Sequence, residues 1–173
     1  GVTRWVLDAA VRQCASWRRA GTELPVAVNL AAANIVDTTL PEAVAAILQR
    51  WEVPGSLLEC EISEDTVMGD PRRATDVLER LRELGVRLSL DDFGTGHSSL
   101  SYLKRLPLDE VKIDRSFVAG MIEDENDAVI VRSTIDLARN LGLTVVAEGV
   151  ETAEIMGELA GLRCDTAQGF HIS

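Results

Sequence analysis

The residues with the clearest chemical potential are carboxylates, amides and a lysine that stand at the ends of short apolar segments. Asp91 and Asp92 are adjacent at the end of one such segment. Two carboxylates this close repel each other unless a cation or a hydrogen-bond network holds them, so a divalent metal is the first functional hypothesis. A structural pair of aspartates that caps a loop is the alternative interpretation.

Similar side chains recur at other segment ends. The whole set is Asn29, Glu61, Asp91, Asp92, Lys112, Glu148 and Gln168. Carboxylates and an amide carbonyl suit Mg²⁺ or Mn²⁺, and the adjacent aspartates could serve two ions. Alternative roles remain for three of them. Asn29 could be a turn-forming amide, Glu61 could have a structural role, and Lys112 could form a salt bridge with Asp91 or Asp114.

Helical and extended patterns alternate along the segments that carry these residues. Apolar residues at helical spacing predict helices over 5–17, 44–51, 77–84 and 130–141. Runs rich in valine, leucine and isoleucine predict strands over 26–31, 57–63, 86–91, 110–114, 143–148 and 168–172, with a poorer strand near 163–165. Asp70 before Pro71 marks a helix start, and Gly85 and Gly142 mark helix ends. This alternation favours parallel strands joined by crossover helices.

Within the predicted strands one parity is apolar and the other is polar or small. Val28 and Leu30 alternate with Ala27, Asn29 and Ala31, for example. A polar face opposite a helix-covered face fits the inside of a closed barrel, whose functional residues collect at the carboxyl ends of the strands. No GxGxxG or P-loop pattern supports an open nucleotide-binding sheet. We therefore expect an α/β barrel.

Composition limits the class of protein and its partners. The 17 basic and 28 acidic residues give a net charge of −11, which argues against a nucleic acid polymer or an anionic membrane as the main partner. The length and a hydrophobic content of 46% predict one globular domain over residues 1–173. The 3 cysteines lack CxxC spacing. No apolar run approaches the roughly 20 residues of a membrane span. We therefore expect a cytoplasmic domain without membrane contact.

Five sequence strings resemble, in order, the successive signatures of the EAL family of cyclic-di-GMP phosphodiesterases. They are VNLAAANI, LECEISED, DDFGTGHSSLSYLKRLPLDEVKID, VVAEGVET and AQGF, and the resemblance runs over nearly the whole chain. It implies a TIM-like (β/α)8 barrel of the EAL type. It also implies hydrolysis of cyclic-di-GMP to the linear dinucleotide pGpG, with Mg²⁺ or Mn²⁺ as two bound ions.

The resemblance assigns the metal ligands. The first metal would be held by Asn29, Glu61 and Asp91, and the second would lie near Asp92 and Glu148. The Glu-Ala-Leu motif that names the family, and whose glutamate binds the first metal, does not occur in this sequence. We therefore expect its strand to precede Gly1 and a closing helix to follow Ser173. The chain would then be a single EAL domain, incomplete at both ends and without its first strand.

The resemblance also assigns catalytic residues. Lys112 would face the attacking water or the phosphate. Glu148 is a candidate general base as well as a candidate ligand, and both roles remain open. Glu64 resembles a glutamate that hydrogen-bonds the DDFGTG loop, and Gln168 resembles an amide beside the catalytic water.

Other functional classes stay open at this point. A catalytically inactive EAL domain could bind cyclic-di-GMP as a receptor, or it could serve as a protein-interaction module. The resemblance further implies a homodimer, and it implies that a GGDEF or sensory domain could be attached in the parent protein.

Overall fold

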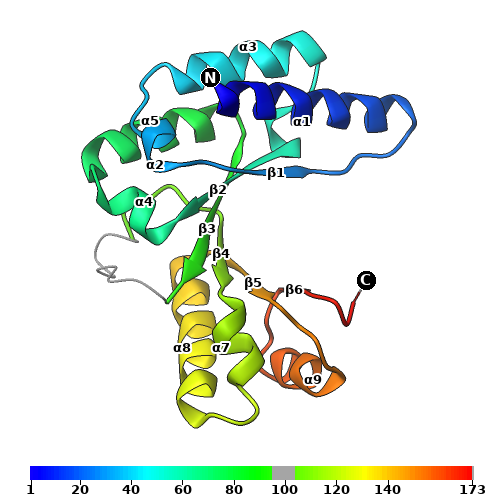
Figure 1. Cartoon of the computed structure of the whole chain (residues 1–173), viewed down its shortest axis with the longest axis vertical. Coiled ribbons are helices and arrows are strands. Elements are labelled where there is room, and N and C mark those ends of the chain that lie inside the picture. Colours follow the sequence, from blue (N-terminus) through cyan, green and yellow to red (C-terminus); the bar gives the residue numbers. More distant parts are fainter. Residues whose placement is uncertain (95–103, 173) are drawn as a thin grey trace.

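The computed structural model describes residues 1–94 and 104–172 as a parallel sheet flanked by helices (Figure 1). The strands are β1 (Val26–Asn29), β2 (Leu58–Ser63), β3 (Arg87–Phe93), β4 (Glu110–Ile113), β5 (Thr144–Glu148) and β6 (Thr166–Gln168). The longer helices are α1 (Val2–Arg19), α3 (Leu40–Trp51), α5 (Pro71–Glu83), α8 (Glu125–Leu141) and α9 (Ala153–Gly161). The shorter ones are α2 (Ala32–Ile35), η1 (Gly55–Leu57), α4 (Glu64–Met68) and α7 (Arg115–Gly120). The DDFGTGHSS motif lies outside the described residues from Thr95 onward.

The strands follow one another across the sheet in the order in which they occur in the sequence. Every described pairing, from β1 with β2 through β5 with β6, is parallel. A doubly wound sheet reverses its strand order at one point, whereas a barrel adds each new strand on the same side. The six described strands therefore form part of a TIM-like barrel, as the sequence predicts.

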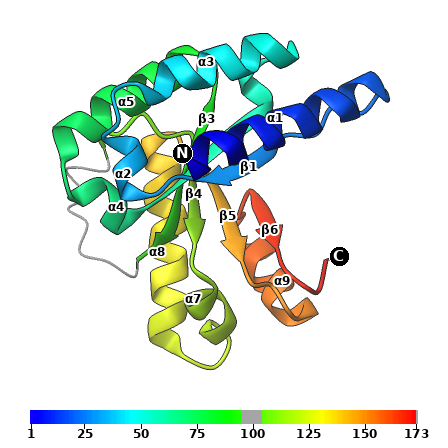
Figure 2. The same cartoon turned by 45° about the horizontal axis from the view of Figure 1, so that its top comes forward.

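The apolar parity of the strands packs against the helices. Leu88 and Leu90 of β3, for example, are 0% and 1% exposed. One apolar cluster joins β1, β2 and β3 to α1, α3 and α5, and a second joins β4 and β5 to α7, α8 and α9. Figures 1 and 2 show these two helix groups on separate halves of the molecule. The opposite, polar face of the sheet is left for function.

Helix α5 illustrates why the sequence folds locally in this way. Its buried residues are Ala74, Val77, Leu78 and Leu81, a spacing that places them on one helical face. Asp70 caps the helix by accepting a hydrogen bond from the Arg73 backbone N–H, an interaction worth about 1 kcal/mol. Gly85 follows the helix with a φ of 80°, a conformation that glycine adopts readily. The predicted helix start and end are confirmed.

The predictions near the carboxyl terminus are wrong in one respect. A strand at 168–172 and a poorer strand near 163–165 were expected, but a single strand lies between them at Thr166–Gln168. Arg163 adopts a φ of 58°, so the chain is still turning there after α9. Gly169 packs so closely on the Val150 backbone that a Cβ atom would lie 2.3 Å from the Val150 nitrogen. The extended chain therefore ends at Gln168.

Within the described residues, the periodicity of apolar residues did not predict the α-helices α2, α4, α7 and α9. Helix α9 buries Ile155 and Leu159 and contains Gly157, so its apolar pattern is too short to stand out. None of the helices within the described residues has the length and apolar composition needed to cross a membrane.

Candidate active site on the polar face of the sheet

The predicted site residues lie on neighbouring strands at one edge of the sheet. Asn29 of β1 stands beside Glu61 of β2, and Glu148 of β5 stands beside Gln168 of β6. Because all the strands are parallel, their carboxyl ends meet at the same edge. The sheet register therefore brings together residues that are more than a hundred positions apart in sequence.

Lys112 is the centre of this group. Its Nζ lies 2.8 Å from Oε1 of Glu61 and 3.9 Å from Oδ1 of Asp91, and it forms an ion pair with Glu148. Its side chain is only 9% exposed. Burial alone would lower the pKa of Lys112, but hydrogen bonds and charges of Glu148 and Glu61 outweigh burial and raise the pKa above its ordinary value. Lys112 is therefore a fixed positive charge.

The alternative interpretation, in which Lys112 forms a salt bridge with Asp91 or Asp114, is confirmed for one of the two residues. Asp91 is one of its ion-pair partners, whereas Asp114 is not among the partners found for it in the described part of the chain. The strongest contacts are instead with Glu61 and Glu148, two of the predicted metal ligands.

Asn29 and Glu61 are tied to each other. Nδ2 of Asn29 donates a hydrogen bond of 3.0 Å to Oε2 of Glu61. The other carboxylate oxygen, Oε1, accepts from Lys112. This pairing fixes the Glu61 side chain from two sides and directs the Asn29 amide to the same carboxylate.

A β-bulge changes the direction of the side chains at the two adjacent aspartates. The register between β3 and β4 shifts between Leu90 and Phe93, and Asp92 has a φ of 55°. In a regular strand, neighbouring side chains point to opposite faces. At a bulge, two residues oppose one residue of the partner strand and the side chains are reoriented. By spacing alone Asp92 would point to the opposite face from Asp91, and the bulge reorients its side chain.

The Asp92 carboxyl lies among other acids. Burial, followed by the charges of Asp91 and Asp114 and a hydrogen bond with Asp114, raises the pKa of Asp92. At Asp114 burial acts in the same upward direction, but hydrogen bonds from the Ser116 hydroxyl and backbone outweigh it and lower the pKa. Of the two carboxyls, Asp92 is therefore the one that keeps a proton to higher pH.

Glu148 and Gln168 border a pocket of about 310 Å³ beside the carboxylate group. Its lining consists of Arg115, Glu148, Glu151, Gln168, Phe170 and the glycines Gly149 and Gly169. Phe170 is 88% exposed. The sequence analysis did not single out Arg115 or Phe170, although Arg115 lies in the KIDR stretch just after Lys112 and Phe170 belongs to the AQGF string.

Glu64 lies at the start of α4, directly after β2, and is 4% exposed. A buried carboxylate at this point needs hydrogen-bond partners. Its predicted contact with the DDFGTG loop concerns residues that extend beyond Gly94, outside the described part. That contact stays a prediction.

The donor chemistry fits a divalent cation. Asn29, Glu61, Asp91, Asp92 and Glu148 offer oxygen atoms, which Mg²⁺ and Mn²⁺ prefer. Within 1–94 and 104–172, no three acidic, cysteine or histidine side chains are already arranged to hold an ion. Lys112 supplies the positive charge between these carboxylates in the structure. The metal assignments therefore rest on the types of the donors and on their common edge of the sheet.

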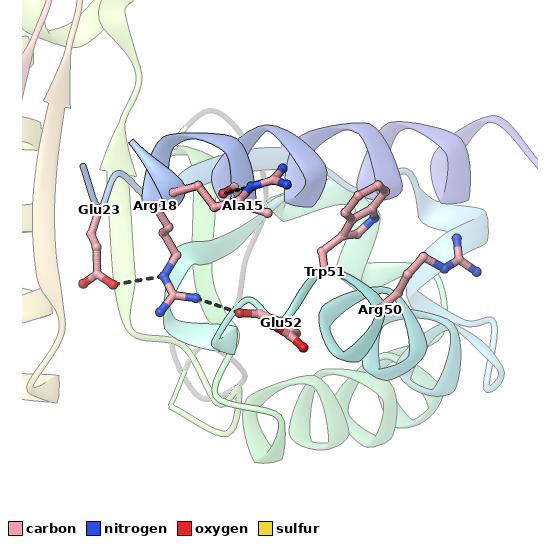
Figure 3. A pocket seen from close by; sticks show the side chains of 7 residues that line it. Ala15, Arg18, Glu23, Arg50, Trp51 and Glu52 are labelled. Carbon is pink, nitrogen blue, oxygen red and sulfur yellow. Dashed lines mark hydrogen bonds and ion pairs between the residues drawn. The ribbon is translucent and has the colours of Figure 1, made fainter. Parts of the chain in front are cut away.

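A larger pocket, of about 490 Å³, lies elsewhere (Figure 3). It is formed near the ends of α1 and α3 by Ala15, Arg18, Arg19, Glu23, Arg50, Trp51 and Glu52. Figure 3 shows Arg18 between Glu23 and Glu52, and Arg18 donates to the Glu23 carboxylate and to the Glu52 carbonyl oxygen. None of the predicted site residues lines this pocket, so its size does not make it the candidate active site.

Comparison with known proteins concerns the family and the fold of the chain. The model of the family described as "EAL domain" matches residues 1–173. The chain is 45% identical to the cyclic di-GMP phosphodiesterase NbdA of Pseudomonas aeruginosa, and the match covers 98% of this chain and 22% of NbdA. It is 44% identical to MucR of the same organism, named a bifunctional diguanylate cyclase and cyclic di-GMP phosphodiesterase, with 98% of this chain and 25% of MucR covered.

A solved structure extends the comparison to the fold. The MucR phosphodiesterase in complex with c-di-GMP superposes with a TM-score of 0.92 at 44% identity, covering 98% of this chain and 69% of that one. The chain thus spans about a quarter of the length of the two curated relatives.

Proposed function

The chain belongs to the EAL domain family, and we propose from this membership that it is a metal-dependent cyclic-di-GMP phosphodiesterase domain. The reaction would hydrolyse one phosphodiester bond of cyclic-di-GMP and release linear pGpG. The observation that carries the proposal is the buried Lys112 among Glu61, Asp91 and Glu148, at the strand ends of a fold matching the MucR complex.

The metal site would use the oxygen donors of this group. Asn29, Glu61 and Asp91 would hold one Mg²⁺ or Mn²⁺, and Asp92 and Glu148 would lie at a second. When bound, such ions lower the pKa of a water molecule and offset negative charge on phosphate oxygens.

Lys112 would stabilise the reaction through its charge. Attack of water oxygen on phosphorus, with cleavage of the bond to the 3′ oxygen, leaves a 5′ phosphate and a 3′ hydroxyl. Negative charge grows on the phosphate oxygens during this step, and a buried ammonium group is effective because it needs no reorganisation. Its contacts with Glu61 and Glu148 would keep it protonated and aimed at the strand ends.

Glu148 and Gln168 would act on the water. Their positions side by side on β5 and β6 suit a pair in which the carboxylate takes the proton and the amide orients the oxygen. Glu148 would otherwise serve only as a ligand of the second ion. Glu64 would act at a distance, by supporting the loop after Asp92.

The wider setting of the domain belongs to the same proposal. The domain would act in the cytoplasm as a homodimer, without contact with the membrane or with nucleic acid polymers. The parent protein would carry an attached GGDEF or sensory domain. The name of MucR, which includes a diguanylate cyclase activity, supports the GGDEF domain.

Turnover of cyclic-di-GMP tests the function. The parent protein is incubated with cyclic-di-GMP and Mg²⁺, substrate is separated from pGpG, and ligand binding is measured in parallel. We expect pGpG to form, and to disappear with EDTA or in an Asp91→Asn variant that still folds. Binding without turnover would refute the enzyme assignment and identify a receptor, while absence of both would leave an interaction module.

A further inference from the structure

A second ionic group lies on the polar face of the sheet, below the candidate active site. Nη2 of Arg87 lies 3.1 Å from Oε2 of Glu110, and Nε of Arg87 lies 3.8 Å from Oε2 of Glu59. The Glu59 and Glu110 side chains are 13% and 11% exposed, so both charges are largely removed from water. Thr144 of β5 also donates to Glu110. We call Glu59, Arg87 and Glu110 the lower ionic group.

On two strands, the lower ionic group and the candidate active site occupy neighbouring side-chain positions of the same face. Glu59 precedes Glu61 by two residues on β2, and Glu110 precedes Lys112 by two residues on β4. Two residues along a strand span about 7 Å, a distance that a lysine side chain can cover by changing rotamers. The Lys112 ammonium is therefore within reach of carboxylates in both groups.

Ser89 lies between the two groups. It pairs in register with Glu61 on one side and with Glu110 on the other. It is 0% exposed, and its hydroxyl has no hydrogen-bond partner among the residues the structure describes. The hydroxyl thus does not link the groups, so each is held together by its own cation: Lys112 above and Arg87 below.

We propose that Arg87 is a positioning residue for Lys112. By pairing with Glu59 and Glu110, Arg87 offsets one of their two negative charges. It thereby weakens the competing attraction that would draw the Lys112 ammonium away from Glu61 and Glu148. Arg87 is suited to this task because a guanidinium group stays charged and can contact two carboxylates at once. The catalytic consequence rests on the proposed phosphodiesterase function, whereas the placement of Lys112 does not.

The placement of Lys112 is tested by NMR of the lysine side chains. The sequence contains two lysines, Lys112 and the exposed Lys104, so protein with ¹⁵N-labelled lysine gives one reporter and one internal reference. We expect Arg87→Gln to shift the Lys112 Nζ resonance and leave that of Lys104 unchanged. Arg73→Gln, which removes an exposed arginine of α5 paired with Asp70, is the matched control.

Charge balance supplies the second test. In the double variant Arg87→Gln/Glu110→Gln the lower ionic group loses one negative charge together with its cation, so the Lys112 resonance should return toward its wild-type position. If Arg87→Gln alone does not fold, a displaced Lys112 resonance in the double variant would still overturn the proposal. A Lys112 resonance that is unchanged in Arg87→Gln, or equally displaced in the double variant, would overturn the proposal.

Kinetics distinguish positioning from a purely structural ion pair. We expect Arg87→Gln to lower kcat for cyclic-di-GMP about tenfold or more with little change in KM, because misplacement of a catalytic group slows the chemical step. Arg87→Lys should recover much of kcat. A kcat in Arg87→Gln equal to that of Arg73→Gln would contradict the proposal. If the wild-type protein shows no turnover, the proposed function fails, and the NMR shifts still decide the placement of Lys112.

Discussion

At the scale of single residues, Lys112 joins stability and chemistry. Three carboxylates surround its ammonium group, and in the absence of metal it is their counterion. Removing one partner of a buried ion pair leaves the remaining charges uncompensated, which costs about 3 kcal/mol or more. The same charges that hold Lys112 in place would attract a divalent cation.

The first prediction concerns Lys112→Met. In metal-free buffer we expect a loss of about 3 kcal/mol in the free energy of unfolding, because Glu61, Asp91 and Glu148 then repel one another. Mg²⁺ should stabilise the variant more than the wild type, since the cation replaces the lost charge. Urea unfolding with and without Mg²⁺ measures both effects. Lys104→Met is the exposed control, and equal stability of the two variants in metal-free buffer would contradict the account.

The second prediction concerns pH and Asp92. Its pKa is raised by burial and by Asp91 and Asp114, so the folded metal-free protein binds this proton more tightly than the unfolded chain does. Stability from this group is complete below the ordinary pKa of an aspartate and is lost as the pH rises through the raised pKa. Asp92→Asn should therefore flatten the pH dependence of the free energy of unfolding between the ordinary pKa of an aspartate and the raised pKa of Asp92. If the free energy of unfolding depends on pH identically in wild type and Asp92→Asn, the Asp92 carboxyl does not contribute to the pH dependence of stability.

The identity of the site residues was the part of the site that sequence predicted best. Polar side chains on the inner face of a strand are costly without a function, and four of them mark the site: Asn29, Glu61, Lys112 and Glu148. The structure brings these residues to one edge of the sheet. The partners of Lys112 were less accessible, because sequence cannot say which of several nearby carboxylates a flexible ammonium group selects. Arg87 alternates with apolar residues in the sequence, but its contact with Glu110 follows only from the β3–β4 register.

At the scale of elements, strands were predicted better than their irregularities. Alternating apolar residues fix which face of β2 or β3 meets the helices. A bulge has no comparable pattern, since it depends on the pairing of Asp91 and Asp92 with a strand about twenty residues later. The end of β6 likewise depends on contact of Gly169 with Val150, which is a tertiary feature.

The third prediction tests the close approach at Gly169. A Cβ atom there would lie 2.3 Å from both the nitrogen and the oxygen of Val150, and backbone atoms cannot move aside easily. We expect Gly169→Ala to cost about 2 kcal/mol and to displace Gln168, which lowers turnover as well. Gly157→Ala in α9 is the control, because nothing lies within 4 Å of its Cβ position and alanine favours helices. Denaturant unfolding that ranks the two variants equally would contradict this reading of β6.

At the scale of the whole molecule, the two apolar clusters hold the sheet from one side and leave the other to polar groups. The first cluster carries the strands of Asn29, Glu61 and Asp91, and the second carries the strand of Glu148. Lys112 lies on β4, whose residues contribute to both clusters through Val111 and Ile113. The candidate active site therefore spans the boundary between the two halves seen in Figure 1.

The barrel architecture could be predicted because strand and helix alternate and because the polar parity persists from strand to strand. The family could be predicted because five strings occur in the expected order, and the match over residues 1–173 confirms it. The two bound metal ions and the homodimer that the resemblance implies stay predictions.

The most direct test of the account is the Mg²⁺ dependence of cyclic-di-GMP turnover in wild type and Glu61→Gln. The central claim is that the carboxylates around Lys112 also hold the catalytic cation. If so, loss of one ligand charge should raise the Mg²⁺ concentration for half-maximal turnover about tenfold or more, equivalent to about 1.4 kcal/mol of binding energy. An unchanged Mg²⁺ requirement in a folded, active Glu61→Gln protein would contradict the claim.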